Sequence, residues 1–289
     1  MSPVGRLVLC FCGSFLAATF AAGESLPLRI EANFPLLEVK LNGAGPFLFL
    51  VDTGADGTMA TPQAMTAAGL LLDYRVDMIG STGRERVAGS SGVEVQLGAL
   101  RVPRVDVIRH DLSAVRRINA RIQGVLGQNV LRRLNYLIAY GNRRMLIGEE
   151  ATIASADLGA RPQSFQRIGG RMAVEGMPAG RAKLPLTLIF DSGASGLALL
   201  DRRPRVQGAT LFRGTAFNEK VQSYCGAGYV TRARLAELVV GEHRFSDLNV
   251  SLIPDNQESI QTEEDGMLPT NLYRAFYVNN QANFLIAAR

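Results

Sequence analysis

The sequence predicts an all-β protein made of two similar lobes, and three observations support that prediction. A run of apolar residues followed by Asp, a hydroxyl residue, Gly and Ala occurs twice, with Asp52 and Asp191 standing 139 residues apart. A second pair of similar segments follows each motif at nearly the same distance. Elsewhere apolar and polar residues alternate with a period of two, which is typical of β-strands.

In the first half, strands are expected at 30–34, 36–41 and 47–51. Thr61 and Pro62 then open a short helix that Gly69 closes, because a hydroxyl caps a helix and Pro fits its first turn. Alternation from 76 to 108, with turns expected at 80–83 and 89–92, indicates hairpins.

In the second half, strands are expected at 172–174 and 184–190, and Pro204 interrupts any helix after Leu200. Alternation resumes at Thr215, turns over 226–228 and continues through Leu252. The acidic stretch from Asp255 to Asp265 is expected to be a solvated surface loop.

The internal repeat extends beyond the motifs. Gly124-Val125-Leu126-Gly127-Gln128-Asn129 follows Asp52 by 72 residues, and Gly266-Met267-Leu268-Pro269-Thr270-Asn271 follows Asp191 by 75. Each segment precedes two short apolar runs, at 136–140 and 145–147 in the first half and at 276–278 and 284–287 in the second. Two Asp-initiated turns that merely close hairpins remain the alternative, although equivalent motifs inside a repeat are much less expected by chance.

These motifs resemble those of aspartic proteases, with Asp-Thr-Gly-Ala closer to the retropepsin-like branch than to pepsin. The resemblance covers nearly everything after residue 27 and implies two β-barrel-like lobes with short helices and a cleft between them. It divides the chain into a signal peptide at 1–23, a first lobe at 24–148, a linker at 149–163 and a second lobe at 164–289. The linker is polar, loses the alternation and contains Gly159 and Pro162.

The resemblance implies that Asp52 and Asp191 are the catalytic pair. Two carboxylates that share one proton can activate a water and protonate a carbonyl oxygen, and they titrate as a unit. By the same resemblance, a second set of residues locks the two loops together and lets backbone amides approach the carboxylates: Thr53, Gly54, Ser192 and Gly193. Pro269, which stands where Gly127 stands in the first half, departs from the family pattern.

Proteases of this kind cover the substrate with a mobile hairpin. The candidates are two glycine-bearing turns, Gly80-Ser81-Thr82-Gly83 in the first lobe and Gly226-Ala227-Gly228 in the second. The second is flanked by Tyr224 and Tyr229, whereas the first lacks an aromatic residue. Ordinary hairpin turns are the alternative for both, and the lobe that supplies the working flap stays open.

Composition excludes other classes of function. The net charge of +5 comes mostly from scattered arginines without interleaved aromatic residues, which favours a solvated basic face over a nucleic-acid site. His110 and His243 stand alone without ligand spacing, so no metal and no cofactor is expected. Cys225 is expected to be a small core or loop thiol rather than a nucleophile.

The first 23 residues have the pattern of an export signal. Arg6 precedes an apolar stretch at 7–18, and Thr19-Phe20-Ala21 has small residues at both ends. A periplasmic or secreted protein without a stable membrane span after signal cleavage is therefore expected, and an uncleaved anchor is the alternative. Because both halves lie in one chain, we expect a monomer.

Two functions fit the sequence. The first is an aspartic endopeptidase that hydrolyses peptide or protein substrates with a water activated between Asp52 and Asp191. The second is a catalytically silent peptide-binding or regulatory protein of the envelope with a protease-like cleft. For the enzyme, Ala55 and Ala194 matter, because pepsin carries hydroxyl residues there that donate to the ionised carboxylate. Without them we expect a pair that stays singly protonated to higher pH than pepsin's.

Overall fold

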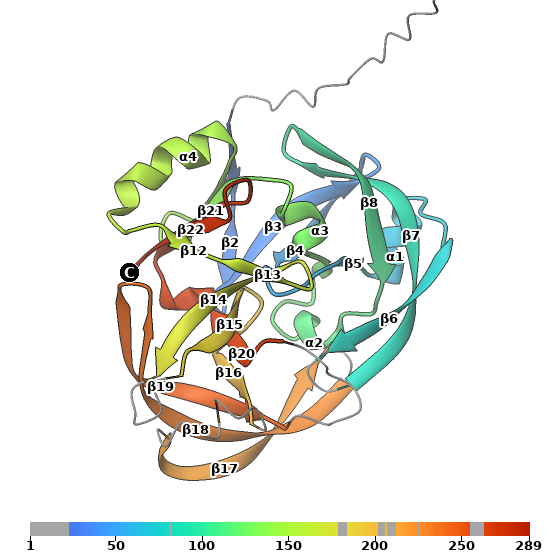
Figure 1. Ribbon diagram of the computed structural model, residues 1–289. Coiled ribbons are helices and arrows are strands. Elements are labelled where there is room, and N and C mark those ends of the chain that lie inside the picture. Colours follow the sequence, from blue (N-terminus) through green and yellow to red (C-terminus); the bar gives the residue numbers. More distant parts are fainter. Residues whose placement is uncertain are drawn as a thin grey trace, which may run out of the picture.

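The computed structural model describes residues 23–80, 83–178, 184–201, 206, 212–224, 226–254 and 263–289. These residues form two eight-stranded sheets, one in each lobe, and a six-stranded sheet to which both halves of the chain contribute (Figure 1). The prediction of an all-β protein with two similar lobes and short helices is confirmed. Residues 1–22 of the expected signal lie outside the described residues.

The sheet of the first lobe has a strand order that places its two motif segments at the centre. Its β4 strand, which leads into Asp52, pairs in parallel with β9, and β9 in turn pairs with β5. In spatial order the strands are β2 (Arg29–Glu31), β3 (Phe34–Leu41), β4 (Ala44–Val51), β9 (Ile122–Leu126), β5 (Thr58–Ala60), β8 (Leu100–Arg109), β7 (Gly83–Leu97) and β6 (Tyr74–Gly80).

The second lobe repeats this order strand for strand, including an extra pairing that closes β3 on β7 and β14 on β18. Its strands are β13 (Gln166–Ile168), β14 (Arg171–Pro178), β15 (Leu186–Asp191), β20 (Gly266–Pro269), β16 (Leu197–Leu200), β19 (His243–Ile253), β18 (Gly226–Val240) and β17 (Phe212–Ser223). The internal repeat read from the sequence is therefore a repeat of sheet topology.

The six-stranded sheet joins the lobes through an antiparallel pairing of β10 with β21, at its centre. From one edge to the other the strands are β1 (Glu24–Pro27), β11 (Arg144–Ile147), β10 (Tyr136–Ala139), β21 (Ala275–Asn279), β22 (Phe284–Ala288) and β12 (Gln163–Ser164). The apolar runs that follow each repeat segment supply its four inner strands.

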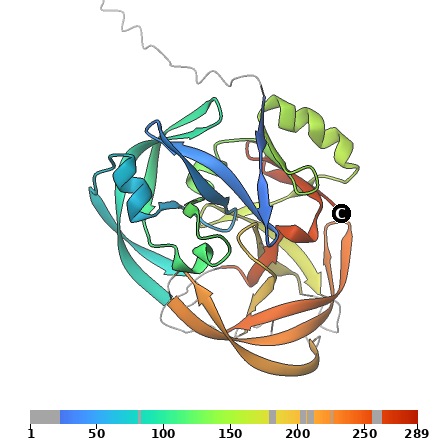
Figure 2. The ribbon, with the colours of Figure 1, turned by 180° about the vertical axis from the view of Figure 1, so that it is seen from behind.

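Helices are short throughout the part of the chain that the structure describes, and none there is long and apolar enough to span a bilayer. They are α1 (Pro62–Ala67), α2 (Ser113–Arg116), α3 (Gln128–Leu131), α4 (Glu149–Ser155), η1 (Ala156–Leu158) and η2 (Thr270–Leu272). Thr61 caps α1 and Pro62 opens it, as the sequence indicated. The stretch expected to link the lobes holds α4, which covers one face of the six-stranded sheet by burying Ala151 beside Leu137 and Tyr277 (Figure 2).

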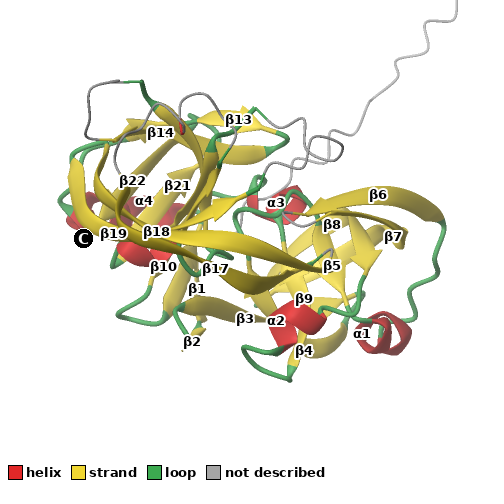
Figure 3. Cartoon of the chain, turned by 90° about the horizontal axis from the view of Figure 1, so that it is seen from below, coloured by secondary structure: helices red, strands yellow, loops and turns green. Residues whose placement is uncertain are grey.

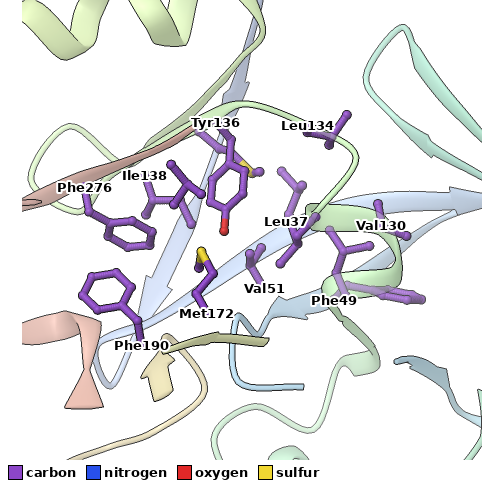
Figure 4. Close-up of a cluster of buried hydrophobic side chains, with 14 of the residues drawn as sticks. Leu37, Phe49, Val51, Val130, Leu134, Tyr136, Ile138, Met172, Phe190 and Phe276 are labelled. Atoms are coloured by element: carbon purple, nitrogen blue, oxygen red, sulfur yellow. The ribbon is translucent and has the colours of Figure 1, made fainter. Parts of the chain in front are cut away.

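One hydrophobic core runs through both lobes and the sheet between them. It includes Val51 and Phe190, the last apolar residues before the two Asp residues, and Tyr136 and Phe276 from the six-stranded sheet (Figure 4). Phe190 and Phe276 pack edge to face with their ring centroids 5.0 Å apart. The ends of the motif strands are therefore anchored by the most buried part of the molecule.

Two expected turns lie elsewhere. Residues 89–92 are inside β7, where the pairing with β8 shifts register, and the turn between these strands is at Gly98 and Ala99. Gly89 is paired with Tyr74, and a Cβ on Gly89 would lie 2.2 Å from the tyrosine ring, so this glycine makes room for a side chain rather than a turn. In the second lobe 226–228 belong to β18, and the turn precedes them.

Candidate active site

The two motif strands are central in their sheets, and the residues that lead directly into each Asp are buried. Val51 pairs with Leu126, and the backbone amide of Asp52 donates to the Leu126 carbonyl over 3.0 Å. In the second lobe Phe190 pairs with Leu268 at the equivalent place, and Asp191 pairs with Pro269. Strands buried on both faces favour continuous apolar runs, which explains why each Asp follows one. The first polar side chain after each run therefore emerges where the lobes meet.

Four reciprocal hydrogen bonds lock the two loops together. The Thr53 hydroxyl donates to the Phe190 carbonyl (2.6 Å) and accepts from the Ser192 amide (2.9 Å). The Ser192 hydroxyl donates to the Val51 carbonyl (2.7 Å) and accepts from the Thr53 amide (3.0 Å). All four bonds are buried, so each hydroxyl satisfies one donor and one acceptor of the opposite loop that would otherwise be unpaired.

Each carboxylate lies against the glycine of the opposite loop. A Cβ on Gly54 would lie 2.3 Å from Asp191 Cγ, and a Cβ on Gly193 would lie 2.4 Å from Asp52 Cγ. The glycines are thus required by close approach. Within its own loop, Asp52 Oδ1 accepts the amides of Gly54 (2.9 Å) and Ala55 (3.0 Å), and Asp191 Oδ1 accepts the amide of Gly193 (2.7 Å).

The two carboxyl groups are buried and interact with each other. Asp52 and Asp191 are only 3% and 6% exposed, and burial raises the pKa of both carboxyl groups. The pKa of Asp191 is raised further, because the charge of Asp52 lies beside it and the hydrogen bond between the two carboxyls favours its protonated form. The same hydrogen bond lowers the pKa of Asp52 and so partly offsets the effect of burial there. Because the two groups interact so closely, they titrate as a pair.

Several polar residues that the motifs did not reveal support this arrangement. The Gln128 side-chain amide donates to the Thr53 carbonyl over 2.9 Å, so the segment that crosses behind the first loop also holds it. The hydroxyl groups of Tyr140 and Thr270 are 2.5 Å apart. Burial, and to a lesser extent the charge of Asp191, raises the pKa of Tyr140. The repeated segment after each motif was the signal that could have found Gln128 and Thr270.

The expectation of a solvated acidic loop is wrong for its last residues. Glu264 and Asp265 are buried: Glu264 pairs with Arg171 over 2.8 Å, and Asp265 Oδ2 accepts the Thr187 amide over 2.8 Å. Buried carboxylates need such partners, and the partners come from distant strands that the local acidic composition cannot show. Residues 255–262 lie outside the described part of the chain.

The flap candidates occupy hairpin ends in both lobes. Gly80 and Gly83 pair at the end of β6 and β7, with Ser81 and Thr82 outside the described residues. Gly226, Ala227 and Gly228 are paired with residues of β17, as the first residues of β18. At the tip of this second hairpin, the Tyr224 hydroxyl donates to Asp52 Oδ2 over 2.8 Å. Sequence reasoning noted Tyr224 as an aromatic residue flanking a candidate flap, not as a partner of Asp52.

The described residues away from the pair hold cavities but no cluster of metal ligands. Two cavities of about 380 and 300 Å³ lie elsewhere, and neither is lined by Asp52 or Asp191. Within the described ranges, no three His, Cys, Asp or Glu side chains are grouped as a metal site would require. Cys225 falls outside those ranges.

Comparisons with known proteins show which proteins this chain resembles. Residues 37–130, which include Asp52, match the family model described as "Aspartyl protease". The fold is similar to that of an aspartic proteinase from Irpex lacteus, with 13% identity, a TM-score of 0.53 and coverage of 92% of this chain and 97% of that one. A retropepsin-like aspartic protease from Rickettsia conorii has 17% identity and a TM-score of 0.34, covering 44% of this chain and 92% of that one. No curated protein sequence matches. The resemblance to aspartic proteases and the bilobal fold it implied are confirmed.

Proposed function

We propose that the protein is an aspartic endopeptidase that cleaves peptide bonds with a water held between Asp52 and Asp191. The observation that carries this proposal is the mutual position of the two carboxyl groups, each seated on the glycine of the opposite loop and held by reciprocal Thr53 and Ser192 bonds. Preorganised groups at a buried position are what acid–base catalysis needs.

The chemistry follows from the unequal protonation of the pair. The ionised Asp52 accepts a proton from the water as its oxygen bonds to the scissile carbonyl carbon. The protonated Asp191 gives its proton to the carbonyl oxygen, so that a neutral gem-diol forms without a full negative charge. The C–N bond then breaks, the leaving nitrogen takes the proton from Asp52, and a diol hydroxyl returns a proton to Asp191. The pair ends as it began.

The silent peptide-binding protein remains a second candidate because the carboxylates are nearly closed to solvent. Asp52 is also in contact with the Tyr224 hydroxyl, which lies at the place where a bound peptide must approach. A protein that kept the cleft and lost turnover would bind peptides without cleaving them.

Cleavage of a peptide library by the purified chain distinguishes the two. An endopeptidase cleaves within peptides, is inhibited by a peptide with a hydroxyl group in place of the scissile amide, and loses cleavage when Asp52 or Asp191 is changed to Asn. The exposed Asp157→Asn variant is the matched control and should cleave normally. Binding of the mimic without any cleavage by the native chain would favour the silent protein.

Export and action as a monomer complete the proposal. The N-terminal pattern of residues 1–23 supports a periplasmic or secreted location. The presence of both carboxyl groups in one chain supports a monomer, since no second copy is needed to complete the pair. Specific activity should then be independent of dilution, measured alongside mass by light scattering.

A further inference from the structure

The hairpin of β17 and β18 carries Tyr224 from the second lobe to the first. Figure 3 shows this hairpin extending from the second lobe toward β5 and β9. Tyr224 lies between the last residue of β17 and the first residues of β18, at the tip. Its hydroxyl reaches Asp52 Oδ2, the oxygen that the amides of Gly54 and Ala55 leave free. The opposite lobe therefore supplies a third donor to Asp52.

The ring of Tyr224 is seated in an apolar site of the first lobe. It packs on the first-lobe cluster, defined as Phe34, Leu36, Leu48, Leu50, Met59, Leu112, Val115, Ile122 and Val125. The ring of His110 meets it edge-on, with centroids 6.4 Å apart and planes at 86°. A side chain whose ring is held by packing presents its hydroxyl in one place.

The direction of the hydrogen bond is set by the chemistry of the two groups. Burial and the neighbouring negative charge of Asp52 raise the pKa of Tyr224 well above that of a free tyrosine. The raised pKa favours the protonated hydroxyl, which donates to the carboxylate. A donor of this kind stabilises the ionised form of Asp52 and lowers its pKa relative to burial alone.

The two carboxyl groups therefore differ in their donors. Asp52 accepts two amides and one hydroxyl, whereas among the described residues Asp191 accepts one amide. We infer that the Tyr224 hydroxyl, brought from the opposite lobe, is the positioning group that holds the negative charge on Asp52 in the free protein. The assignment of Asp52 as base and Asp191 as acid rests on the proposed function, but the placement of the charge does not.

This inference answers the question that Ala55 raises. The residue after the motif glycine has no hydroxyl to donate to Asp52, and Tyr224 supplies one from 172 residues away. The expectation that the pair stays singly protonated to higher pH than pepsin's remains a prediction, but Ala55 is not the only position from which a hydroxyl could reach Asp52.

Other charged or titratable groups lie around the pair, and any pH dependence includes them. His110 contacts Tyr224 and lies 3.5 Å from a carboxylate oxygen of β7, and a charge on β14 acts on Asp191. His110 contacts Tyr224, and Glu85 and Asp111 contact His110 in turn. Tyr140 and Arg171 interact electrostatically with Asp191.

The direct test is a carbon NMR titration of the carboxyl groups in chains labelled at Asp. In the native chain, the ionisation at lowest pH should appear in the Asp52 signal. In Tyr224→Phe, which loses only the hydroxyl, its midpoint should move upward by about one pH unit, the size expected for one hydrogen bond to a charged group. Tyr229→Phe removes a hydroxyl from the same hairpin at an exposed position and should leave it unchanged. An unchanged Asp52 midpoint in Tyr224→Phe, or a first ionisation at Asp191, overturns the inference.

A kinetic test gives a second readout. The acidic limb of the kcat/KM profile reports ionisation in the free enzyme, so it should move upward by about one pH unit in Tyr224→Phe and not in Tyr229→Phe. Faster cleavage by Tyr224→Phe with an unmoved limb would overturn the inference and show that the tyrosine only obstructs substrate. If no variant cleaves any peptide, the proposed function fails, while the NMR titration still decides where the charge lies.

Discussion

In the first lobe, the segment behind the Asp52 loop supports it through amide hydrogen bonds, whereas two of the equivalent groups are absent from the second lobe. The Gly127 amide donates to the Thr58 hydroxyl (3.2 Å), and the amides of Gln128 and Asn129 donate to carbonyls of the Asp52 loop. At the equivalent positions of the second lobe stand Pro269, which has no amide hydrogen, and Leu197, which has no hydroxyl.

This difference shows how a duplicated site can change without losing its geometry. The donor of Gly127 and the acceptor of Thr58 are absent together from the second lobe, so neither group is left buried and unpaired. Leu197 is buried, and Phe190 packs on Tyr273 with ring centroids 5.6 Å apart. Replacing both partners of a buried hydrogen bond by apolar groups can be nearly neutral, whereas replacing one is costly. The departure at Pro269 is therefore compatible with an intact second loop.

The largest expected effect tests whether the lobes act as one catalytic unit. Asp52→Asn and Asp191→Asn should each lower kcat/KM by at least about a thousandfold, because neither remaining carboxyl can act as both acid and base. The double variant should be little worse than either single one. Losses that multiply in the double variant would mean that the lobes contribute independently.

Removing either hydroxyl that joins the two loops should destabilise the protein by a similar amount. Thr53→Val and Ser192→Ala each leave one buried carbonyl and one buried amide without a partner, so each should lower the free energy of unfolding by about 3 kcal/mol. Denaturant unfolding of both variants measures this. The exposed Ser91→Ala, whose hydroxyl bonds Asp73, is the control and should cost less than about 1 kcal/mol.

Substitution by Ala should destabilise the protein more at Gly127, behind the Asp52 loop, than at Pro269, behind the Asp191 loop. A Cβ on Gly127 would lie 2.2 Å from the Gly57 carbonyl, so Gly127→Ala should cost about 2 to 3 kcal/mol through strain. Pro269→Ala adds no atom beyond the proline it replaces and should cost about 1 kcal/mol or less. Equal losses in thermal unfolding would contradict the different support of the two loops.

The smallest expected effect is a slope of stability with pH. Because the pKa of Asp191 is raised by folding, its contribution is fully present below the pKa of an unfolded Asp and is lost as pH rises through the folded value. The free energy of unfolding should therefore fall by up to about 1.4 kcal/mol per pH unit in that window. Asp191→Asn should flatten this slope, and an unchanged slope would show that Asp191 is not the group responsible.

Short-range patterns were sufficient for much of this description. The apolar strands that end in Asp52 and Asp191, the Thr61 cap of α1 and the paired runs of the six-stranded sheet follow from periodicity and turn chemistry. The turn expected at 89–92 was misplaced because Gly89 is a glycine for another reason: it makes room for the Tyr74 ring. The sequence alone does not distinguish such a glycine from one in a turn. Glu264 and Asp265 were expected at the surface because their partners are far away in the sequence.

The sequence alone determined that two equivalent loops exist, since each loop is encoded by a strand, an acid, a hydroxyl residue and a glycine within a few positions. Only the tertiary structure decided that the two carboxyl groups are not equivalent. Tyr224 reaches Asp52 from a hairpin of the other lobe. Gln128 donates a hydrogen bond to the Asp52 loop, whereas Pro269, behind the Asp191 loop, has no amide hydrogen to donate. The physical reason is that a pKa depends on every donor and charge within a few ångströms, and the chain brings these together from positions more than a hundred residues apart.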